Sequence, residues 1–303
     1  MKFSITILGC SSATPTSDRN PSAQLINHNE KLFLVDCGEG TQVQLRRNHF
    51  RFIRIDHIFI SHLHGDHFFG LIGLLSTMHL LGRKKGLHLF APPELEEVIL
   101  QQFRVSATIL AYPLHFHPTQ AEMPAIIMEN NFLEVISIPL SHRIPTTGFI
   151  FKEKPGLRSI NAGAVQEYNI PYTVFEALKA GSDFSTPDGK ILSNEMLTSA
   201  PAPSRSYVYC SDTAYCEPII PVIKGMDVLY HETTFMADRA AIAAEKFHST
   251  TVEAATIALK AGVKKLLIGH YSARYDDLQP LLEETRTVFP ESYLTQDGSV
   301  FDI

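Results

Sequence analysis

The sequence lacks an apolar run long enough to cross a membrane. The longest candidate, residues 68–81, is interrupted by Gly70, Gly73 and His79, whereas a membrane-spanning helix needs about 20 consecutive apolar residues. The apolar stretch at the N-terminus ends at Gly9, short of the roughly 7–15 residues of a signal-peptide core. We therefore predict a first β-strand there, with neither a membrane span nor a secretory leader.

Cysteine is scarce. The chain has four, at positions 10, 37, 210 and 216, and none forms a CxxC pair. Cys37 and Cys210 lie among apolar residues, where a free thiol behaves as a small apolar side chain. We expect free core cysteines rather than disulfides or metal ligands. Together with the missing leader, this predicts a cytoplasmic location.

Positive charge is not in excess, because 26 Lys and Arg residues oppose 32 Asp and Glu residues for a formal net charge of −6. Proteins that bind nucleic acids indiscriminately usually carry a basic balance. An RNA-directed function would therefore depend on a local patch of positive charge. Bound divalent cations would also change the field around their site.

What the sequence does contain is the pattern of an α/β protein. Of its 303 residues, 45% are apolar, enough for a large core, and an α/β chain of this length often forms one unit. The apolar pattern predicts helices at 68–82 and 251–261, the second with a capping box that involves Glu253. It also predicts strands that include residues 31–35, 55–61, 132–140, 206–210, 228–230 and 265–268.

The strongest motif is the run His62-Leu63-His64-Gly65-Asp66-His67, directly after the predicted strand at 55–61. Zinc binds imidazole and carboxylate groups, and catalytic zinc sites leave a position open for water. His62 and His64 are two apart on an extended chain and can face one ion, while Asp66 and His67 can face another. A His-rich surface loop is the alternative, but four ligand-type residues so close together favour metal. Mn²⁺ or another divalent ion would also suit these ligands.

A site for two ions needs further ligands, and three candidates follow other predicted strands: His142, Asp212 and His270. Residues beyond strand ends gather at one rim of an α/β fold. Asp212 could bridge two ions through its two carboxylate oxygens. Any one of the three, taken alone, could equally be structural, and their shared placement after strands is what favours binding.

The stretch from Glu153 to Pro203 differs from the rest, being rich in Pro, Gly, Ser and charge, with little sustained periodicity. Long insertions of this kind in a compact domain are usually functional arms or disordered segments. A mobile polar loop with solvated charges is the plain alternative.

The HLHGDH run, with Asp36 in LVDCGEGTQ, resembles the metallo-β-lactamase superfamily. Within it the chain resembles the ribonuclease Z family, which trims the 3′ end of precursor tRNA. Six segments carry this second resemblance: ILGCSSATP, SHRIPTTGF, YCSDT, YHETTF, HSTTVEAA and GHYSARY. The resemblance implies an α/β fold, a four-layer αββα sandwich forming a single domain over residues 1–303. It also implies an inserted flexible arm at about 153–192 and a homodimer.

The resemblance further implies two Zn²⁺ ions per subunit. It assigns His62, His64 and His142 to one ion and Asp66, His67 and His270 to the other, with Asp212 bridging them. Asp36 would orient a ligand histidine. Two ions in such a site can clamp a phosphodiester and activate water.

Catalytic and substrate roles follow from the same resemblance. Asp66 would orient or deprotonate the nucleophile, and His248, held by Glu232, would act as general acid. Arg274, with Ser272 and Tyr275 beside it, is expected to contact phosphate. In the arm, Lys154 and Lys179 are expected to meet tRNA phosphates. From the residues alone, His248 could instead help cap a helix, Glu232 could be a loop acid, and Arg274 could belong to a surface ion pair.

The function predicted is removal of the 3′ trailer from precursor tRNA, leaving a 3′-hydroxyl on the tRNA. One rival is another hydrolase of the same fold, such as a general phosphodiesterase or an arylsulfatase-like esterase. A second rival is a catalytically silent RNA-binding or scaffold protein, which the complete set of ligands disfavours. Ser17 stands where the family has Lys in the loop that rejects CCA-bearing tRNA, so we expect that discrimination to differ.

Overall fold

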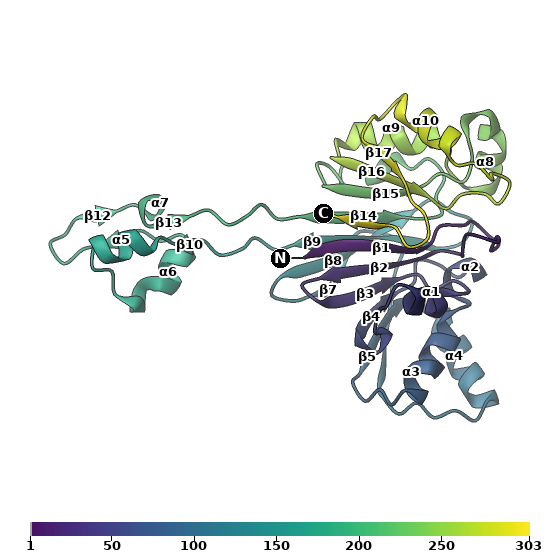
Figure 1. Cartoon of the computed structure of the whole chain (residues 1–303), viewed down its shortest axis with the longest axis horizontal. Coiled ribbons are helices and arrows are strands. Elements are labelled where there is room, and N and C mark those ends of the chain that lie inside the picture. Colours follow the sequence, from purple (N-terminus) through teal and green to yellow (C-terminus); the bar gives the residue numbers. More distant parts are fainter. Residues whose placement is uncertain (1) are drawn as a thin grey trace. The chain divides into compact units, whose positions relative to one another are not determined.

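A computed structural model describes residues 2–303 and contains two seven-stranded sheets (Figure 1). In spatial order the first sheet consists of β18 (Val300–Asp302), β1 (Phe3–Gly9), β2 (Ala23–His28), β3 (Lys31–Val35), β4 (Ile55–Phe59), β5 (Leu87–Ala91) and β6 (Leu114–Pro118). The second consists of β17 (Ser292–Leu294), β16 (Lys265–Gly269), β15 (Val228–Glu232), β14 (Ser206–Cys210), β9 (Thr146–Glu153), β8 (Leu133–Leu140) and β7 (Ala125–Glu129).

Both sheets are mixed. In the first, β1, β2 and β3 pair antiparallel, whereas β3 to β6 run parallel. In the second, β14 to β17 run parallel. Because parallel strands end at the same edge of a sheet, the loops after β3, β4, β14, β15 and β16 are grouped at strand ends, where ligand sites of α/β folds usually form.

The inner faces of the two sheets pack on each other through aromatic side chains. The Phe59 ring lies 5.5 Å from that of Phe149 and 5.4 Å from that of Phe151, between ring centroids. The Tyr207 hydroxyl, from β14, donates a hydrogen bond to Gln24 in β2. These rings are fully buried, so they bind the sheets together by the apolar area removed from water.

Helices cover the outer faces. On the first sheet lie α1 (Thr41–Arg47), α2 (Gly65–Phe68), α3 (Leu71–Leu80) and α4 (Glu94–Val105), whose apolar side chains share a buried cluster with β3, β4 and β5. On the second lie α9 (Thr251–Ala261) and α10 (Gln279–Arg286), and α8 (Ala240–Lys246) precedes α9 (Figure 1). Short 3₁₀ turns lie at η1 (Phe52–Arg54), η3 (Glu217–Ile219) and η4 (Ala237–Arg239). The four-layer αββα architecture is therefore confirmed.

The local predictions were mostly confirmed. The helix at 251–261 has the predicted bounds, and Thr250 forms a capping box with Glu253. The prediction of one helix over 68–82 was wrong in detail. The chain forms the short α2 first and restarts at Leu71, because the Gly70 amide bonds back to the Cys37 carbonyl at 2.9 Å. The four cysteines are free and buried, as expected.

The chain divides into two compact units. The smaller comprises Glu129–Glu134 and Lys152–Arg205. Its own elements are β10 (Ser159–Ile160), α5 (Ala162–Glu167), η2 (Tyr172–Val174), α6 (Phe175–Lys179), β11 (Phe184–Ser185), β12 (Ile191–Leu192), α7 (Asn194–Leu197) and β13 (Thr198–Ser199). Leu178, Leu192 and Leu197 form part of a separate apolar cluster there. The expected insertion at about 153–192 falls in this unit, and the division into one domain plus an arm stays a prediction.

Within residues 2–303, no helix combines the length and the apolar character needed to cross a membrane.

Candidate metal centre

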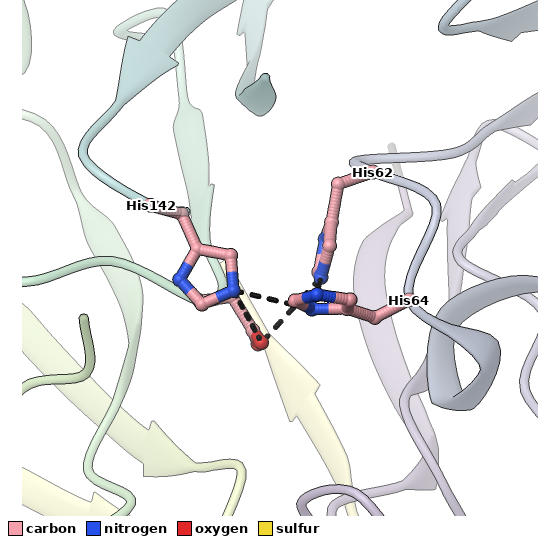
Figure 2. Close-up of side chains that lie close together, drawn as sticks. His62, His64 and His142 are labelled. Carbon is pink, nitrogen blue, oxygen red and sulfur yellow. Dashed lines mark hydrogen bonds and ion pairs between the residues drawn. The ribbon is translucent and has the colours of Figure 1, made fainter. Parts of the chain in front are cut away.

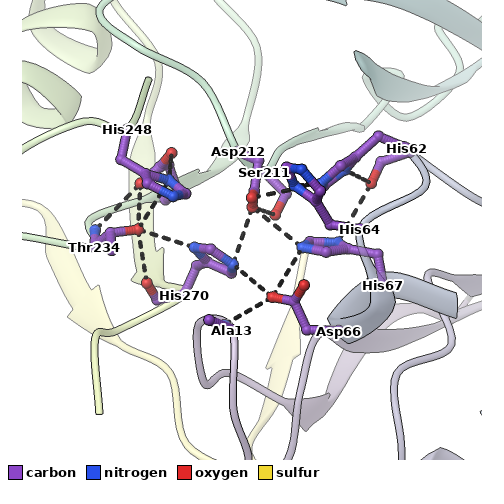
Figure 3. Close-up of polar contacts among 12 residues, drawn as sticks. Ala13, His62, His64, Asp66, His67, Ser211, Asp212, Thr234, His248 and His270 are labelled. Carbon is purple, nitrogen blue, oxygen red and sulfur yellow. Dashed lines mark hydrogen bonds and ion pairs between the residues drawn. The ribbon is translucent and has the colours of Figure 1, made fainter. Parts of the chain in front are cut away.

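The candidate ligands lie directly after strand ends. His62 follows β4, His142 follows β8, Asp212 follows β14 and His270 follows β16. Asp36, Asp212 and His270 each have a positive φ, of 56°, 40° and 57°. This backbone region is unfavourable for residues with a Cβ and is often found at functional sites. Here the positive φ terminates each strand. The side chains of Asp212 and His270 lie in the polar cluster of Figure 3, and Asp36 contacts this cluster through His67.

One group brings together His62, His64 and His142 (Figure 2), and Asp212 is its fourth member. The His64 Nδ1 atom lies 3.1 Å from His62 Nε2 and 3.2 Å from His142 Nε2. The Asp212 Oδ2 atom lies 3.5 Å from His62 Nε2 and 3.7 Å from His142 Nε2. Three imidazole nitrogens and one carboxylate oxygen therefore face a common point.

A second group consists of Asp66, His67 and His270 (Figure 3). The Oδ2 atom of Asp66 lies 3.5 Å from the Nε2 atoms of both His67 and His270. The other oxygen of Asp212, Oδ1, lies 3.2 Å from His67 Nε2 and 3.0 Å from His270 Nε2. Asp212 thus faces one group with each of its oxygens.

The geometry of these residues fits divalent cations. The far nitrogen of four histidines is already engaged: His62 Nδ1 with Ser61 at 3.0 Å, His67 Nδ1 with Asp36 at 2.7 Å, His142 Nδ1 with the Phe247 carbonyl at 2.8 Å and His270 Nδ1 with Thr234 at 2.9 Å. The near nitrogens of His67 and His270 are buried and have no hydrogen-bond partner among the described residues. Such an arrangement, with one nitrogen fixed and the other free, is typical of metal-binding histidines.

The protonation states of the two groups differ. Burial lowers the pKa of His64 and of His142 to about 4, so both rings are neutral and keep a lone pair. Although burial would lower the pKa of His67 and His270, the surrounding carboxylates, above all Asp212, raise the pKa of His67 and raise that of His270 to about 10. An ion bound to the second group would displace a proton from each of these two rings. Burial would raise the pKa of Asp66, but the charge of His67 and the His270 Nε2 atom, 3.5 Å away, outweigh it and hold that pKa below its ordinary value. The carboxylate therefore stays ionised.

His248 and Glu232 form a hydrogen-bonded pair beside the second group. His248 Nδ1 donates to Glu232 Oε1 at 2.8 Å, and the same oxygen accepts the Thr213 amide at 2.7 Å. Burial alone would lower the pKa of His248, but the Glu232 carboxylate outweighs it and raises that pKa. The imidazole is 13% exposed, so its other nitrogen remains available to a ligand in the adjoining cleft.

That cleft has a volume of about 340 Å³ and is open to solvent. His64, Asp66, Asp212 and His248 all line it. Both groups of candidate metal ligands and the His248–Glu232 pair therefore contribute residues to the wall of one cavity.

The predicted substrate residues near the cleft lie in the loop after His270. Arg274 is exposed and stacks over the Phe235 ring at 5.0 Å. The Tyr275 hydroxyl accepts the Met236 amide at 3.1 Å, and the Ser272 amide donates to the Thr234 carbonyl at 3.3 Å. Their contacts hold this loop against the segment after Glu232, and their roles toward phosphate stay predictions.

The two predicted lysines lie in the smaller unit. Lys154 forms an ion pair with Glu129 at 2.7 Å, so a phosphate there would compete with a carboxylate. Lys179 is exposed at the end of α6. Their contact with RNA also stays a prediction.

Three further residues, which the sequence did not single out, hold the candidate ligands in place. Ser61 donates a hydrogen bond from its amide to Asp36 Oδ1 at 2.8 Å and from its hydroxyl to Oδ2 at 2.9 Å. The Tyr209 hydroxyl donates to Asp36 Oδ2 at 2.7 Å. Thr234 connects His270 with Glu232, to which its hydroxyl donates at 2.5 Å. The only signal in the sequence was their position beside the motifs, which does not reveal such long-range contacts.

Comparison with known proteins gives full-length matches. A protein named Ribonuclease Z from Porphyromonas gingivalis is 48% identical over 304 residues, covering 99% of both chains. One of the same name from Bacteroides thetaiotaomicron is 46% identical over 302 residues, covering 100% of this chain and 96% of that protein. The crystal structure of human tRNase Z, short form, superposes with a TM-score of 0.71 at 26% identity, covering 98% of each chain.

Two further matches concern the fold and the N-terminal part of the chain. The metallo-β-lactamase fold protein YhfI from Bacillus subtilis superposes with a TM-score of 0.70 over 100% of both chains, at 19% identity, and so shows the fold alone. Residues 3–107 match the family model described as Anti-Pycsar protein Apyc1. The matches confirm the predicted metallo-β-lactamase fold.

Proposed function

The chain belongs to the ribonuclease Z family, and on this premise we propose that it is a zinc-dependent endoribonuclease that removes the 3′ trailer from precursor tRNA. The single observation that carries the proposal is the position of Asp212 between two groups of ligands. Its two oxygens lie 3.5 Å from His62 Nε2 and 3.0 Å from His270 Nε2. A carboxylate shared between two sets of imidazoles is what a site for two divalent ions requires.

His62, His64 and His142 would hold one ion, and Asp66, His67 and His270 the other, with Asp212 shared. Imidazole nitrogens and ionised carboxylates suit Zn²⁺, and Mn²⁺ could take the same ligands. Binding would displace the Nε2 protons of His67 and His270, whose pKa values the nearby carboxylates raise. When bound, two such ions supply positive charge to a phosphodiester and lower the pKa of water. Asp36, through His67, would keep one imidazole in the required orientation.

The protein's own groups would orient the attacking water and protonate the leaving oxygen. Asp66 keeps a low pKa and lines the cleft, so it would accept a hydrogen bond from the attacking water rather than act as a strong base. The water oxygen forms a bond to phosphorus and releases its proton to the solvent of the open cleft, and the bond from phosphorus to the tRNA 3′ oxygen breaks. That oxygen takes the bonding electrons and needs a proton.

His248 is placed to give that proton. Its Nδ1–H points to Glu232, so Nε2 is the atom that would donate in the imidazolium form. The products would be a tRNA with a 3′-hydroxyl and a trailer with a 5′-phosphate. Glu232 would hold the ring and favour its charged form, since it raises the pKa of His248.

The proposal extends to a homodimer, supported by exposed apolar side chains on α3, α4 and the loop that follows. Leu80 is 79% exposed, Val105 73% and Ile109 87%. Large apolar side chains left in solvent would form an interaction surface if they lie together. Sedimentation analysis of the purified protein tests this, and a monomer at all concentrations would contradict it. The cytoplasmic location expected from the sequence stays a prediction.

Cleavage assays with two substrates test the proposed function. We expect precursor tRNA to be cut and bis(p-nitrophenyl) phosphate to be a much poorer substrate, with two divalent ions per subunit by elemental analysis. His64→Ala should abolish both activities. If the small diester were cleaved while precursor tRNA stayed intact, the general phosphodiesterase would be the better hypothesis. If the protein bound no metal, a catalytically silent RNA-binding protein would be.

A further inference from the structure

A second hollow, of about 420 Å³, lies against the metal centre on the side of His142. His142 and Ser61 form part of its wall, and Ser61 bonds to both His62 and Asp36. The hollow therefore adjoins the residues that would hold one metal ion. We call it the side pocket.

Arg143 lines both the side pocket and the catalytic cleft. Its side chain is exposed and forms no ion pair or hydrogen bond within the described part of the chain. The other charged residues that line the cleft, apart from its histidines, are the acids Glu39, Asp66 and Asp212. Arg143 is therefore the cation at the junction of the two cavities, where an arginine can hold a phosphate by charge-assisted hydrogen bonds.

The chemistry of the side pocket differs from that of the cleft. Apolar Pro92 and Ile144 line it together with the uncharged polar Thr119 and Gln120. The Thr119 hydroxyl is buried and has no hydrogen-bond partner among residues 2–303. A buried polar group without a partner is costly, which is consistent with a site that a ligand completes.

Two carboxylates also line the side pocket, those of Glu94 and Glu122. They would repel a phosphate, but they can accept hydrogen bonds from exocyclic amino groups of bases, as carboxylates do with cytosine. Apolar walls with a few polar groups suit a flat heterocycle, in the way that protein pockets bind single-stranded bases. The distribution of charge therefore favours the phosphate of a nucleotide at Arg143 and its base in the side pocket.

We propose that the side pocket binds the nucleobase of a nucleotide next to the scissile bond, while Arg143 contacts the phosphate between pocket and cleft. The inference rests on the proposed function, because it takes a single-stranded RNA end as the substrate. This contact would bind the substrate at the scissile bond itself, independently of any contact made by the smaller unit.

The test uses the full-length, metal-loaded protein and three precursor tRNAs. One is unmodified, and the other two carry an abasic nucleotide on one or the other side of the scissile bond. Ala121→Leu adds bulk to the pocket lining at a half-buried loop position, and Arg143→Ala removes the cation, with Arg143→Lys as the conservative variant. Matched controls are Ala244→Leu and Arg104→Ala, at exposed positions on α8 and α4.

On unmodified precursor, Ala121→Leu and Arg143→Ala should each lower kcat/KM by about tenfold or more, the scale expected when one base contact is lost. The loss should fall mainly on KM, with metal content unchanged and partial recovery in Arg143→Lys. The wild type should show a similar loss on one of the abasic substrates, and Ala121→Leu should lose nothing further on that substrate.

Two outcomes would overturn the proposal. In the first, Ala121→Leu cleaves the unmodified precursor as well as Ala244→Leu does. In the second, the kcat/KM of Ala121→Leu is lower than that of the wild type by the same factor on all three substrates. These differ from a failure of the proposed function, in which the wild type leaves every precursor tRNA intact.

Discussion

The Nδ1 atom of His67 lies 2.7 Å from the Oδ2 atom of Asp36, and both side chains are fully buried. The Asp36 carboxylate is itself held by hydrogen bonds from Ser61 and from the Tyr209 hydroxyl of the facing sheet. The carboxylate fixes the proton of His67 on Nδ1 and leaves Nε2 facing Asp212 at 3.2 Å. If His67 binds a metal ion as proposed, Asp36 would determine the orientation of its imidazole without touching the ion.

Replacing Asp36 tests this relationship. Asp36→Asn keeps the shape of the side chain, but an amide both donates and accepts hydrogen bonds. It therefore defines the tautomer of the His67 imidazole less well than a carboxylate, which only accepts. We expect metal affinity to fall by about 10–100-fold, measured by competition with a fluorescent chelator. Asp302→Asn, on the exposed C-terminal strand, is the control. Equal affinities for the two variants would show that Asp36 does not orient the ligand.

The His248–Glu232 pair predicts a specific pH dependence of kcat. His248 must be protonated to donate, so activity should fall as the pH rises through its pKa. Glu232 raises that pKa despite the opposing effect of burial. Glu232→Gln removes the charge, lowers the pKa of His248 and should shift the alkaline limb of the profile to lower pH. His248→Ala should reduce kcat by about 10²–10⁴-fold without loss of metal. An alkaline limb unmoved by Glu232→Gln would exclude His248 as the acid.

The smaller unit can be removed at a well-defined point. The Glu153 amide donates to the Arg205 carbonyl at 2.9 Å, so the two ends are adjacent and a short Gly-Ser linker can replace residues 155–203. We expect this deletion to raise KM for precursor tRNA strongly while leaving hydrolysis of bis(p-nitrophenyl) phosphate unchanged. The same KM for tRNA as in the wild type would exclude the unit from substrate binding.

A ladder of imidazole rings in the first sheet predicts acid sensitivity of the fold. The His57 ring, on β4, packs against Phe33 at 5.3 Å and stacks on His88 at 5.2 Å. Burial, aided by His88, lowers the pKa of His57 to about 4. The unfolded chain, with an ordinary pKa near 6.5, therefore binds the proton first as the pH falls from 6.5 towards 4, and stability is lost over that range.

His57→Phe retains a ring in the ladder and removes its titration. Between pH 7.5 and pH 5, His57 should account for about 2 kcal/mol of lost stability. The free energy of unfolding in urea should thus fall less for the variant than for the wild type, by about that amount. Identical losses for the two proteins would show that His57 does not resist protonation in the folded state.

The sequence revealed the fold where local signals were strong. The capping box at Thr250 and the strands that lead to His62, Asp212 and His270 are determined by neighbours along the chain. Residues directly after strands were good candidates for metal ligands because parallel strands end at the same edge of a sheet. The break between α2 and α3 was missed, since it depends on a hydrogen bond from Gly70 to distant Cys37.

The rest of the site depends on contacts between segments far apart in the sequence. Asp36 follows β3 of the first sheet, whereas Tyr209 lies in β14 of the second. Arg143 is a candidate only because it lines two adjoining cavities. No periodicity or spacing encodes such contacts. The positive φ of Asp212 and His270 was equally invisible, because neither residue is a glycine.

The central claim, hydrolysis of the tRNA–trailer bond at the centre built around Asp212, is tested most directly by cleaving precursor tRNA in ¹⁸O-labelled water and analysing both products by mass spectrometry. Attack of water on phosphorus should place one ¹⁸O atom in the 5′-phosphate of the trailer and leave the 3′-hydroxyl of the tRNA unlabelled. A 2′,3′-cyclic phosphate on the tRNA, with no label in the trailer, would contradict it.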